Sequence, residues 1–250
     1  MKTTQFTPVE RVFLQQAEID QMSTKMPYIT VENFPKLGML ASLRFLEWVS
    51  QNPNGVISLP TGKTSEYFIK YTHFFLENWD NKKGQDLLAA YGLNGVKKPD
   101  LSGLQFVQTD EFYPISSTQH NSFCNYVQKY YIKGFGLDPK KALLINSDEI
   151  ELAEGKSFEE VFPGLTIDLS LRFREAKTPQ EKIQQKSILL IDNWCTEFEK
   201  KVRALGGIGF WLGSIGPDGH IAFNTRGTDH YSTTRLTATN FETQAVAAGD

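Results

Sequence analysis

Short apolar runs alternate along the chain with segments whose apolar residues recur at helical spacing. The runs are rich in bulky and β-branched residues and predict strands at 56–59, 104–108, 142–146 and 208–212. Helical spacing between them predicts helices over 67–79, 121–133 and 183–204. This alternation predicts parallel strands joined by helical crossovers. We therefore expect an α/β fold with a doubly wound, mostly parallel Rossmann-like sheet and helices on both faces.

Two further helices are expected before the first strand. Thr7-Pro8-Val9-Glu10 has the N-cap, the N1 proline and the N3 glutamate of a capping box, which predicts a helix start. A second apolar stripe begins at Leu37 and ends near Asn52. Residues 1–55 are thus predicted to be an N-terminal helical extension that packs on an α/β domain of residues 56–250.

The alternation breaks at about 147–185, in a mixed and charged segment that contains several glycines and prolines. The segment is longer than a usual connection between elements, so we predict an insertion in the domain. A lid, an interface arm and a surface elaboration without a role of its own all remain open for it.

Composition narrows the classes of function. The chain has 250 residues, of which 40% are hydrophobic and 22% charged, with a formal net charge of −3. No basic excess is present for nucleic acid, and no apolar run approaches the roughly 20 residues of a membrane span. We expect neither partner, and a cytoplasmic location. Two cysteines and four histidines without ligand spacing imply no metal site, and Cys124 and Cys195 are expected in the core.

The stretch 213–224 places a carboxylate and an imidazole, Asp218 and His220, on a glycine-rich turn. It follows the run 208–212, which we interpret as a core strand covered on both faces. Ligands of open parallel sheets bind beyond the carboxyl ends of the strands, so this position favours a site. An ordinary surface turn is the alternative, since Pro-Asp-Gly is itself turn chemistry.

Two other loops follow predicted strands in the same way. Thr61, Gly62, Lys63 and Thr64 form a glycine-containing turn before a helix, which suits a small phosphate cradle or simple helix capping. A nucleotide P-loop is excluded, because position 57, where that motif needs glycine, is isoleucine. In the other loop, Asp110 and Glu111 are adjacent and only one can face a pocket; we predict that it is Asp110, acting as a general base, although both could be solvated loop acids.

Three segments together resemble the glucosamine-6-phosphate deaminase family, within the 6-phosphogluconolactonase-like superfamily. They are Leu59-Pro60-Thr61-Gly62, Thr109-Asp110-Glu111-Phe112 and Gly216-Pro217-Asp218-Gly219-His220-Ile221-Ala222-Phe223-Asn224. The resemblance covers about Val56 to Arg235, with the interruption at 147–185. The last segment is the most specific, because the related 6-phosphogluconolactonases share its Asp-Gly-His core but not the Ile-Ala-Phe-Asn that follows.

The resemblance implies isomerisation and deamination of glucosamine 6-phosphate to fructose 6-phosphate and ammonia, with a sugar phosphate as partner and no cofactor. Asp110 would move a proton between C2 and C1, and His220, oriented by Asp218, would assist ring opening. Thr61, Gly62, Lys63 and Thr64 would bind the 6-phosphate. Homo-oligomers are usual in this family, so the chain is a candidate homo-oligomer.

Some positions depart from the family pattern. Thr225 stands where the family usually has glutamate, which puts the ring-opening relay in question. Arg235 falls where the family often places an effector-binding arginine, though a surface role fits it equally. The family also continues beyond the point where this sequence stops, so we expect a sheet truncated at its C-terminus and weak turnover. A sugar-phosphate sensor without activity and a lactonase-like hydrolase stay open as alternatives.

Overall fold

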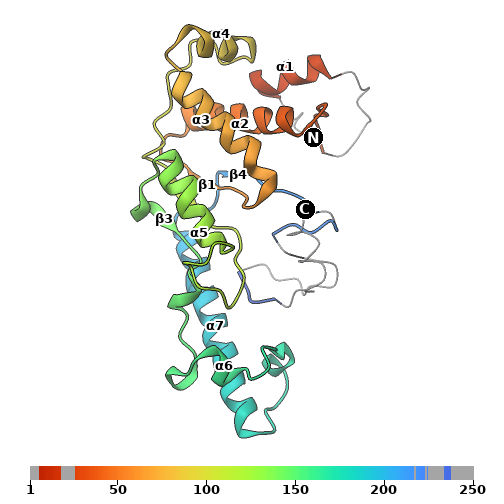
Figure 1. Ribbon diagram of the computed structural model, residues 1–250, viewed down its shortest axis with the longest axis vertical. Coiled ribbons are helices and arrows are strands. Elements are labelled where there is room, and N and C mark those ends of the chain that lie inside the picture. The colour runs from red at the N-terminus through yellow and green to blue at the C-terminus, as the bar shows by residue number, and fades with distance from the viewer. Residues whose placement is uncertain (1–5, 18–25, 217, 223, 225–233, 238–250) are drawn as a thin grey trace.

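A four-stranded sheet, parallel throughout and ordered β3-β2-β1-β4, forms the centre of the protein (Figure 1). The computed structural model describes residues 6–17, 26–216, 218–222, 224 and 234–237. Its strands are β1 (Val56–Ser58), β2 (Gln105–Val107), β3 (Ala142–Leu143) and β4 (Phe210–Trp211). All four lie within the predicted runs, and each is shorter than its run, because pairing ends where the loops at the sheet edges turn away.

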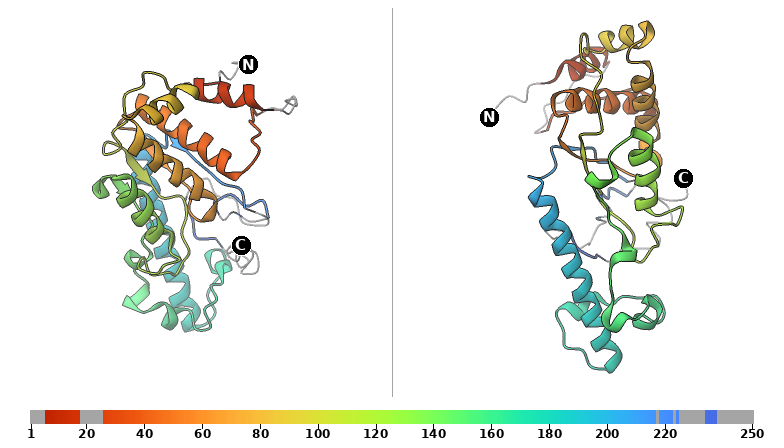
Figure 2. Two further views of the ribbon diagram at one scale, coloured as in Figure 1. Left: turned by 45° about the horizontal axis from the view of Figure 1, so that its top comes forward. Right: turned by 90° about the vertical axis from the view of Figure 1, so that its left-hand side faces the viewer.

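Helices cover both faces of this sheet, which confirms the predicted fold class. The α-helices are α1 (Pro8–Gln16), α2 (Phe34–Gln51), α3 (Glu66–Asn78), α4 (Lys82–Ala90), α5 (Phe123–Val127), α6 (Phe158–Val161) and α7 (Pro179–Ala204). Ile57 and Phe106 pack on one face with α2, α3 and the segment after α5, whereas Val56 and Val107 meet Phe198 of α7 on the other. Figure 2 shows α7 and α5 on opposite sides of the strands.

The first two helices belong to the same core as the sheet. The predicted capping box at Thr7 and Glu10 starts α1, which places Val9 and Phe13 against α2. Glu47 is a buried carboxylate of α2 that pairs with Arg44 and accepts a hydrogen bond from the Val9 amide at 3.4 Å. These polar contacts hold α1 on α2 within the predicted extension, and the extension packs on the sheet through apolar contacts.

The strand β4 differs from expectation. We predicted a strand covered on both faces at 208–212, but the side chains of Ile208 and Trp211 are 39% and 49% exposed. Phe210 packs inward, on Phe45 and Trp48, and Leu212 also contacts this core. The prediction was wrong because β4 lies at the edge of the described sheet, where the helices reach only one of its faces.

The segment at 147–185 is folded around an apolar cluster of its own, at the opposite end of the molecule from α1 and α4 (Figure 1). Val161, Phe162 and Leu171 pack there on the first half of α7. The helix α7 begins at Pro179, four residues before the predicted start, so the predicted boundary at 185 lies inside a helix. The shift follows from a capping box at Thr178, which the apolar pattern did not reveal.

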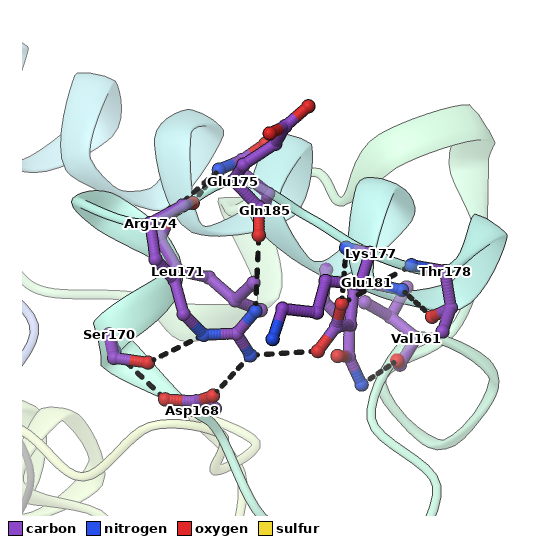
Figure 3. A network of polar contacts seen from close by, with 11 residues as sticks. Val161, Asp168, Ser170, Leu171, Arg174, Glu175, Lys177, Thr178, Glu181 and Gln185 are labelled. Carbon is purple, nitrogen blue, oxygen red and sulfur yellow. Dashed lines mark hydrogen bonds and ion pairs between the residues drawn. The ribbon is translucent and has the colours of Figure 1, made fainter.

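Polar contacts close this unit, as Figure 3 shows. The Arg174 guanidinium bridges the carboxylates of Asp168 and Glu181, at 2.7 and 2.8 Å. Hydrogen bonds from Ser170 and from Arg174 lower the pKa of Asp168 to about 2. The side-chain amide of Gln185 donates to the carbonyls of Leu171 and Arg174. The 3₁₀ turn η6 (Leu169–Arg172) is thereby fastened to α7.

Other sequence predictions can be checked on single elements. Both cysteines are buried, as expected. Within the described residues, none of the helices combines the length and apolar character that crossing a membrane requires.

We predict that Gly38→Ala destabilises the protein, although alanine is the better helix former. A Cβ at Gly38 of α2 would lie 2.6 Å from the Tyr67 carbonyl carbon and 2.7 Å from the Phe68 nitrogen, in the backbone of α3. Separating the two helices should cost about 1–3 kcal/mol of unfolding free energy, measured by urea denaturation. Leu37→Ala, at the neighbouring exposed position, is the control and should change stability much less. Equal stability of Gly38→Ala and wild type would contradict the close packing of α2 on α3.

Candidate functional site

A cavity opens at the carboxyl ends of β1, β2 and β4. The chain runs from β1 to β2 and β3 on one side and then returns to pair β4 with the other side of β1. Such a switch point leaves a crevice between loops that depart in opposite directions. The described residues that line it are Pro60, Thr61, Thr109, Asp110, Phe123, Trp211, Leu212, Gly213, Ser214, His220 and Ala222.

The cavity brings together residues from the three loops that the sequence singled out. Thr61, Asp110 and His220 all line it, although they are far apart in the chain. Its volume is about 80 Å³, below the 300–1,000 Å³ typical of pockets for larger ligands. It could therefore enclose the reacting end of a small molecule while the remainder extends outside.

Asp110 is half-buried at the end of β2, and its backbone is fixed by its neighbour Gln108. The buried Gln108 amide donates to the Asp110 carbonyl at 2.8 Å and accepts from the Ile145 amide at 3.0 Å. Burial, and next the negative charge of Glu111, raise the pKa of Asp110 to about 7, while His220 opposes the shift. A carboxyl group with this pKa can both take and give a proton near neutral pH.

Glu111 has a different role from its neighbour. Its carboxylate accepts hydrogen bonds from the Ser122 hydroxyl and from the amides of Phe123 and Cys124, at 2.7, 3.0 and 2.7 Å. It therefore satisfies amides at the start of α5 that have no partner within the helix. The prediction that only one carboxylate of the pair faces the pocket is confirmed, since Asp110 lines the cavity and Glu111 does not.

The imidazole of His220 is held by a carboxylate from its own turn. Its Nδ1 lies 2.5 Å from Oδ1 of Asp218. Burial acts to raise the pKa of Asp218, but the hydrogen bond and charge of His220 and hydrogen bonds from the backbone together outweigh it, so the pKa is lowered. A proton held on Nδ1 by a carboxylate leaves Nε2 as the ring nitrogen that exchanges protons with a substrate.

Glycines shape this turn. A Cβ on Gly216 would lie 2.2 Å from Cε1 of His220, so the ring rests directly on the glycine backbone. Gly219 has a φ of 84°, which glycine adopts without strain. The Gly216 amide donates to the His220 carbonyl at 2.9 Å and closes the loop. Pro217, Phe223 and Thr225 lie outside the described residues.

The predicted phosphate turn leads from β1 into the 3₁₀ turn η1 (Lys63–Ser65), which α3 continues. Of its four predicted ligands, only Thr61 lines the cavity; Lys63 and Thr64 are exposed beside it. Gly62 has a φ of 88° and a ψ of −170°. The backbone N–H groups of Gly62, Lys63 and Thr64 meet no acceptor among the described residues. Free amides at the start of a helix suit an anion.

Curated proteins resemble the chain over short stretches only, and no family model matches it. The chain is 54% identical over 46 residues to a glucosamine-6-phosphate deaminase of Borrelia hermsii, and 49% identical over 49 residues to one of Caenorhabditis elegans. A glucosamine-6-phosphate deaminase 2 of Bos taurus is 57% identical over 42 residues. These stretches cover 18%, 20% and 17% of this chain and 17%, 18% and 15% of the respective relatives, so the chain matches less than a fifth of their length.

The likeness of fold extends further than the likeness of sequence. A solved structure of a monomeric glucosamine-6-phosphate deaminase, described as a missing link of the NagB superfamily, aligns with a TM-score of 0.58. The alignment covers 88% of this chain and 67% of that one, at 18% identity. The chain therefore shares short stretches of sequence with glucosamine-6-phosphate deaminases and the fold of one of them.

Arg235, the candidate effector ligand of this deaminase family, lies outside the cavity. Its guanidinium donates to the Asp192 carbonyl of α7 at 3.2 Å. The neighbouring carbonyl of Leu236 accepts from Arg172, whose guanidinium also forms a buried bidentate pair with Asp192. The segment 234–237 is thus attached along α7, and effector binding by Arg235 stays a prediction.

Several residues of the candidate site escaped the sequence analysis. Phe123 and Trp211 contribute aromatic walls to the cavity, and Gln108 fixes the backbone of Asp110. Trp211 and Gln108 lie within predicted strands and Phe123 within a predicted helix. At such positions the apolar pattern predicts whether a side chain is buried, but not whether it faces a cavity. The Ser122 N-cap of α5 was the one local signal, since it places Phe123 at a helix start beside the sheet edge.

We predict that Gly216→Ala displaces the imidazole of His220, because the new methyl group would occupy the space of the ring. In nitrogen-detected NMR of the histidine ring, the Nδ1 signal should lose the character of a hydrogen bond to Asp218. Ile215→Ala, at the exposed neighbouring position, should leave the ring signals as in wild type. Unchanged ring signals in Gly216→Ala would show that the contact is not close.

We also predict that the Asp110 carboxyl titrates with a midpoint of about 7, observable by carbon NMR and assigned with Asp110→Asn. The folded protein then holds this proton to higher pH than the unfolded chain, whose aspartates titrate near 3.9. The free energy of unfolding should consequently fall as pH rises between these values, by up to about 4 kcal/mol from this group. Asp110→Asn should remove that fall. A midpoint near 4 would contradict the proposed desolvation.

Proposed function

We propose that the protein converts glucosamine 6-phosphate and water into fructose 6-phosphate and ammonia. The observation that carries this proposal is the shared cavity of Asp110 and His220, with Thr61 of the candidate phosphate turn in its wall. One proton-transferring carboxyl, one oriented imidazole and one anion-binding turn are the groups that this reaction needs. The similarity to deaminases supports the choice of an amino sugar phosphate.

Ring opening is the first task, and we assign it to His220. The C1 hydroxyl of the cyclic sugar must lose a proton while the ring oxygen gains one, so that the bond between C1 and the ring oxygen breaks. An imidazole performs both transfers at neutral pH, because its unperturbed pKa is near 6.5. Asp218 fixes the orientation of the ring, because its Oδ1 lies 2.5 Å from the ring Nδ1.

Asp110 then acts on the opened chain. Its carboxylate takes the proton from C2, and the electron pair forms a double bond between C1 and C2 while the C1 oxygen is protonated. Return of the proton to C1 leaves a C2 imine, which adds water and releases ammonia. A pKa of about 7 keeps Asp110 ready both to accept and to return this proton.

The turn after β1 would bind the phosphate. The amides of Gly62, Lys63 and Thr64 and the hydroxyls of Thr61 and Thr64 supply donors, and the Lys63 ammonium adds charge. Because the cavity is small, the phosphate would sit at its rim, where Lys63 and Thr64 are exposed. A cytoplasmic location and a homo-oligomeric state remain predictions.

We predict that Asp110→Asn abolishes turnover and leaves binding of glucosamine 6-phosphate within about threefold of wild type. The amide keeps the shape of the side chain but cannot accept the C2 proton, so kcat should fall at least about 10³-fold. Ammonia and fructose 6-phosphate are measured with enzyme-coupled assays, and binding by calorimetry. Asp86→Asn, on the exposed surface of α4, is the matched control and should keep wild-type rates.

The same measurements separate the alternatives. Binding of glucosamine 6-phosphate by wild type without any ammonia release would refute the deaminase and favour a sugar-phosphate sensor. Hydrolysis of 6-phosphogluconolactone in place of deamination would favour the lactonase-like hydrolase. Turnover by Asp110→Asn at the wild-type rate would remove Asp110 from the mechanism.

A further inference from the structure

Two tyrosine hydroxyls contact the backbone of the turn that follows β1. The Tyr131 hydroxyl donates to the Pro60 carbonyl at 2.5 Å. The Tyr126 hydroxyl lies 3.1 Å from the Gly62 carbonyl oxygen and 2.9 Å from the Ser65 hydroxyl, which is itself 2.7 Å from that carbonyl. Both carbonyls at the bend of the turn are therefore held by side chains.

The hydrogens available to these oxygens fix the direction of the contacts. Each hydroxyl has a single hydrogen to donate, and a carbonyl oxygen has none. Tyr126 and Ser65 thus bring two hydrogens to three contacts. At most one of these hydrogens can lie between the two hydroxyls, so at least one is directed to the Gly62 carbonyl. The carbonyl is anchored whichever hydroxyl donates.

A π-helix brings the two tyrosines together. The segment Gln128–Lys133, which continues α5, is a π-helix, where hydrogen bonds join residues five apart. Residues five apart lie on different faces of an α-helix but close to one face of a π-helix. Tyr126 and Tyr131 are five apart, and their ring centroids are 6.0 Å from each other. The change of helix type thus directs both hydroxyls to the same turn.

The surroundings leave the Tyr131 hydroxyl little alternative. Its ring is fully buried, 5.7 Å from that of Phe106 and 6.5 Å from that of Phe68. Burial raises the pKa of Tyr131 far above its usual range, so the hydroxyl remains a donor at every working pH. A buried hydroxyl without its acceptor would lose about 1–3 kcal/mol, which holds the contact in place.

Fixing a carbonyl also fixes the amide on the other side of the same peptide. In a trans peptide the C=O and N–H groups point in opposite directions. The Pro60 and Gly62 carbonyls point to the tyrosines, so the N–H groups of Thr61 and Lys63 point away from that helix. We propose that Tyr126 and Tyr131 are positioning residues that aim these two amides at the phosphate of the substrate. This inference rests on the proposed function, which assigns the phosphate to this turn.

The test compares Tyr126→Phe and Tyr131→Phe with Tyr130→Phe, whose exposed side chain belongs to the same helix. Calorimetry measures binding of glucosamine 6-phosphate and of glucosamine without phosphate. Tyr131→Phe should weaken binding of the phosphorylated sugar by roughly 3- to 10-fold, as expected for one hydrogen bond, and leave the other sugar unaffected. Tyr126→Phe should act in the same direction but less, because Ser65 still donates to the Gly62 carbonyl. Tyr130→Phe should bind both like wild type.

Turnover separates this inference from the proposed function. Higher KM with nearly unchanged kcat in Tyr126→Phe and Tyr131→Phe supports positioning, because phosphate binding is equal in ground and transition states. An active wild type with unchanged affinity in both variants would overturn the positioning role and leave the deaminase intact. Equal weakening of both sugars would also overturn it, as general damage to the cavity. Tyrosine-dependent binding without ammonia release would keep the positioning role and refute the deaminase. Tyr126, being only half-buried, is the variant expected to fold in any case.

Discussion

The pairing of β4 with β1 is the contact on which the rest of the site depends. Ile57 faces Phe210 and Ser58 faces Trp211, so the loop after β4 leaves the sheet directly beside the loop after β1. Without that pairing, the loops that carry Thr61 and His220 would not lie next to each other. The ring of Phe210 contacts the rings of Phe45 and Trp48, and these contacts connect the strand β4 to α2 and stabilise the pairing. The helical N-terminal part therefore supports the site through β4.

The same edge of the sheet holds three carboxylates with three separate environments. The carboxylate of Glu111 accepts hydrogen bonds at the start of α5, and that of Asp218 pairs with an imidazole. The carboxyl of Asp110 has neither kind of partner, and burial raises its pKa. Asp110, whose pKa is raised, is also the carboxyl that lines the cavity. Groups driven apart in pKa by their surroundings are the usual means by which one site performs both acid and base steps.

Much of this arrangement was predictable from the sequence, because it follows local rules. Loops after apolar runs marked Asp110 and His220, and the capping box at Thr7 gave the start of α1 to the residue. Other features depend on contacts between distant segments. The helix α4 was missed because its apolar residues form one run at its end, 87–90, without helical spacing, and the π-helix because its bonding leaves no period in the sequence. The exposure of Trp211 depends on which strand lies at the sheet edge, and no single run encodes that.

The helix α7 takes part in two hydrophobic cores. Its second half, through Phe198, covers the sheet, and its first half, through Ile188 and Ile191, packs mainly on the unit at 147–185. At 1.5 Å per residue, 26 residues make a rod of about 39 Å that joins these cores. Excising that unit would expose the apolar side of the first half of α7 to water. The unit and the sheet domain are therefore expected to require each other in any recombinant or evolutionary rearrangement.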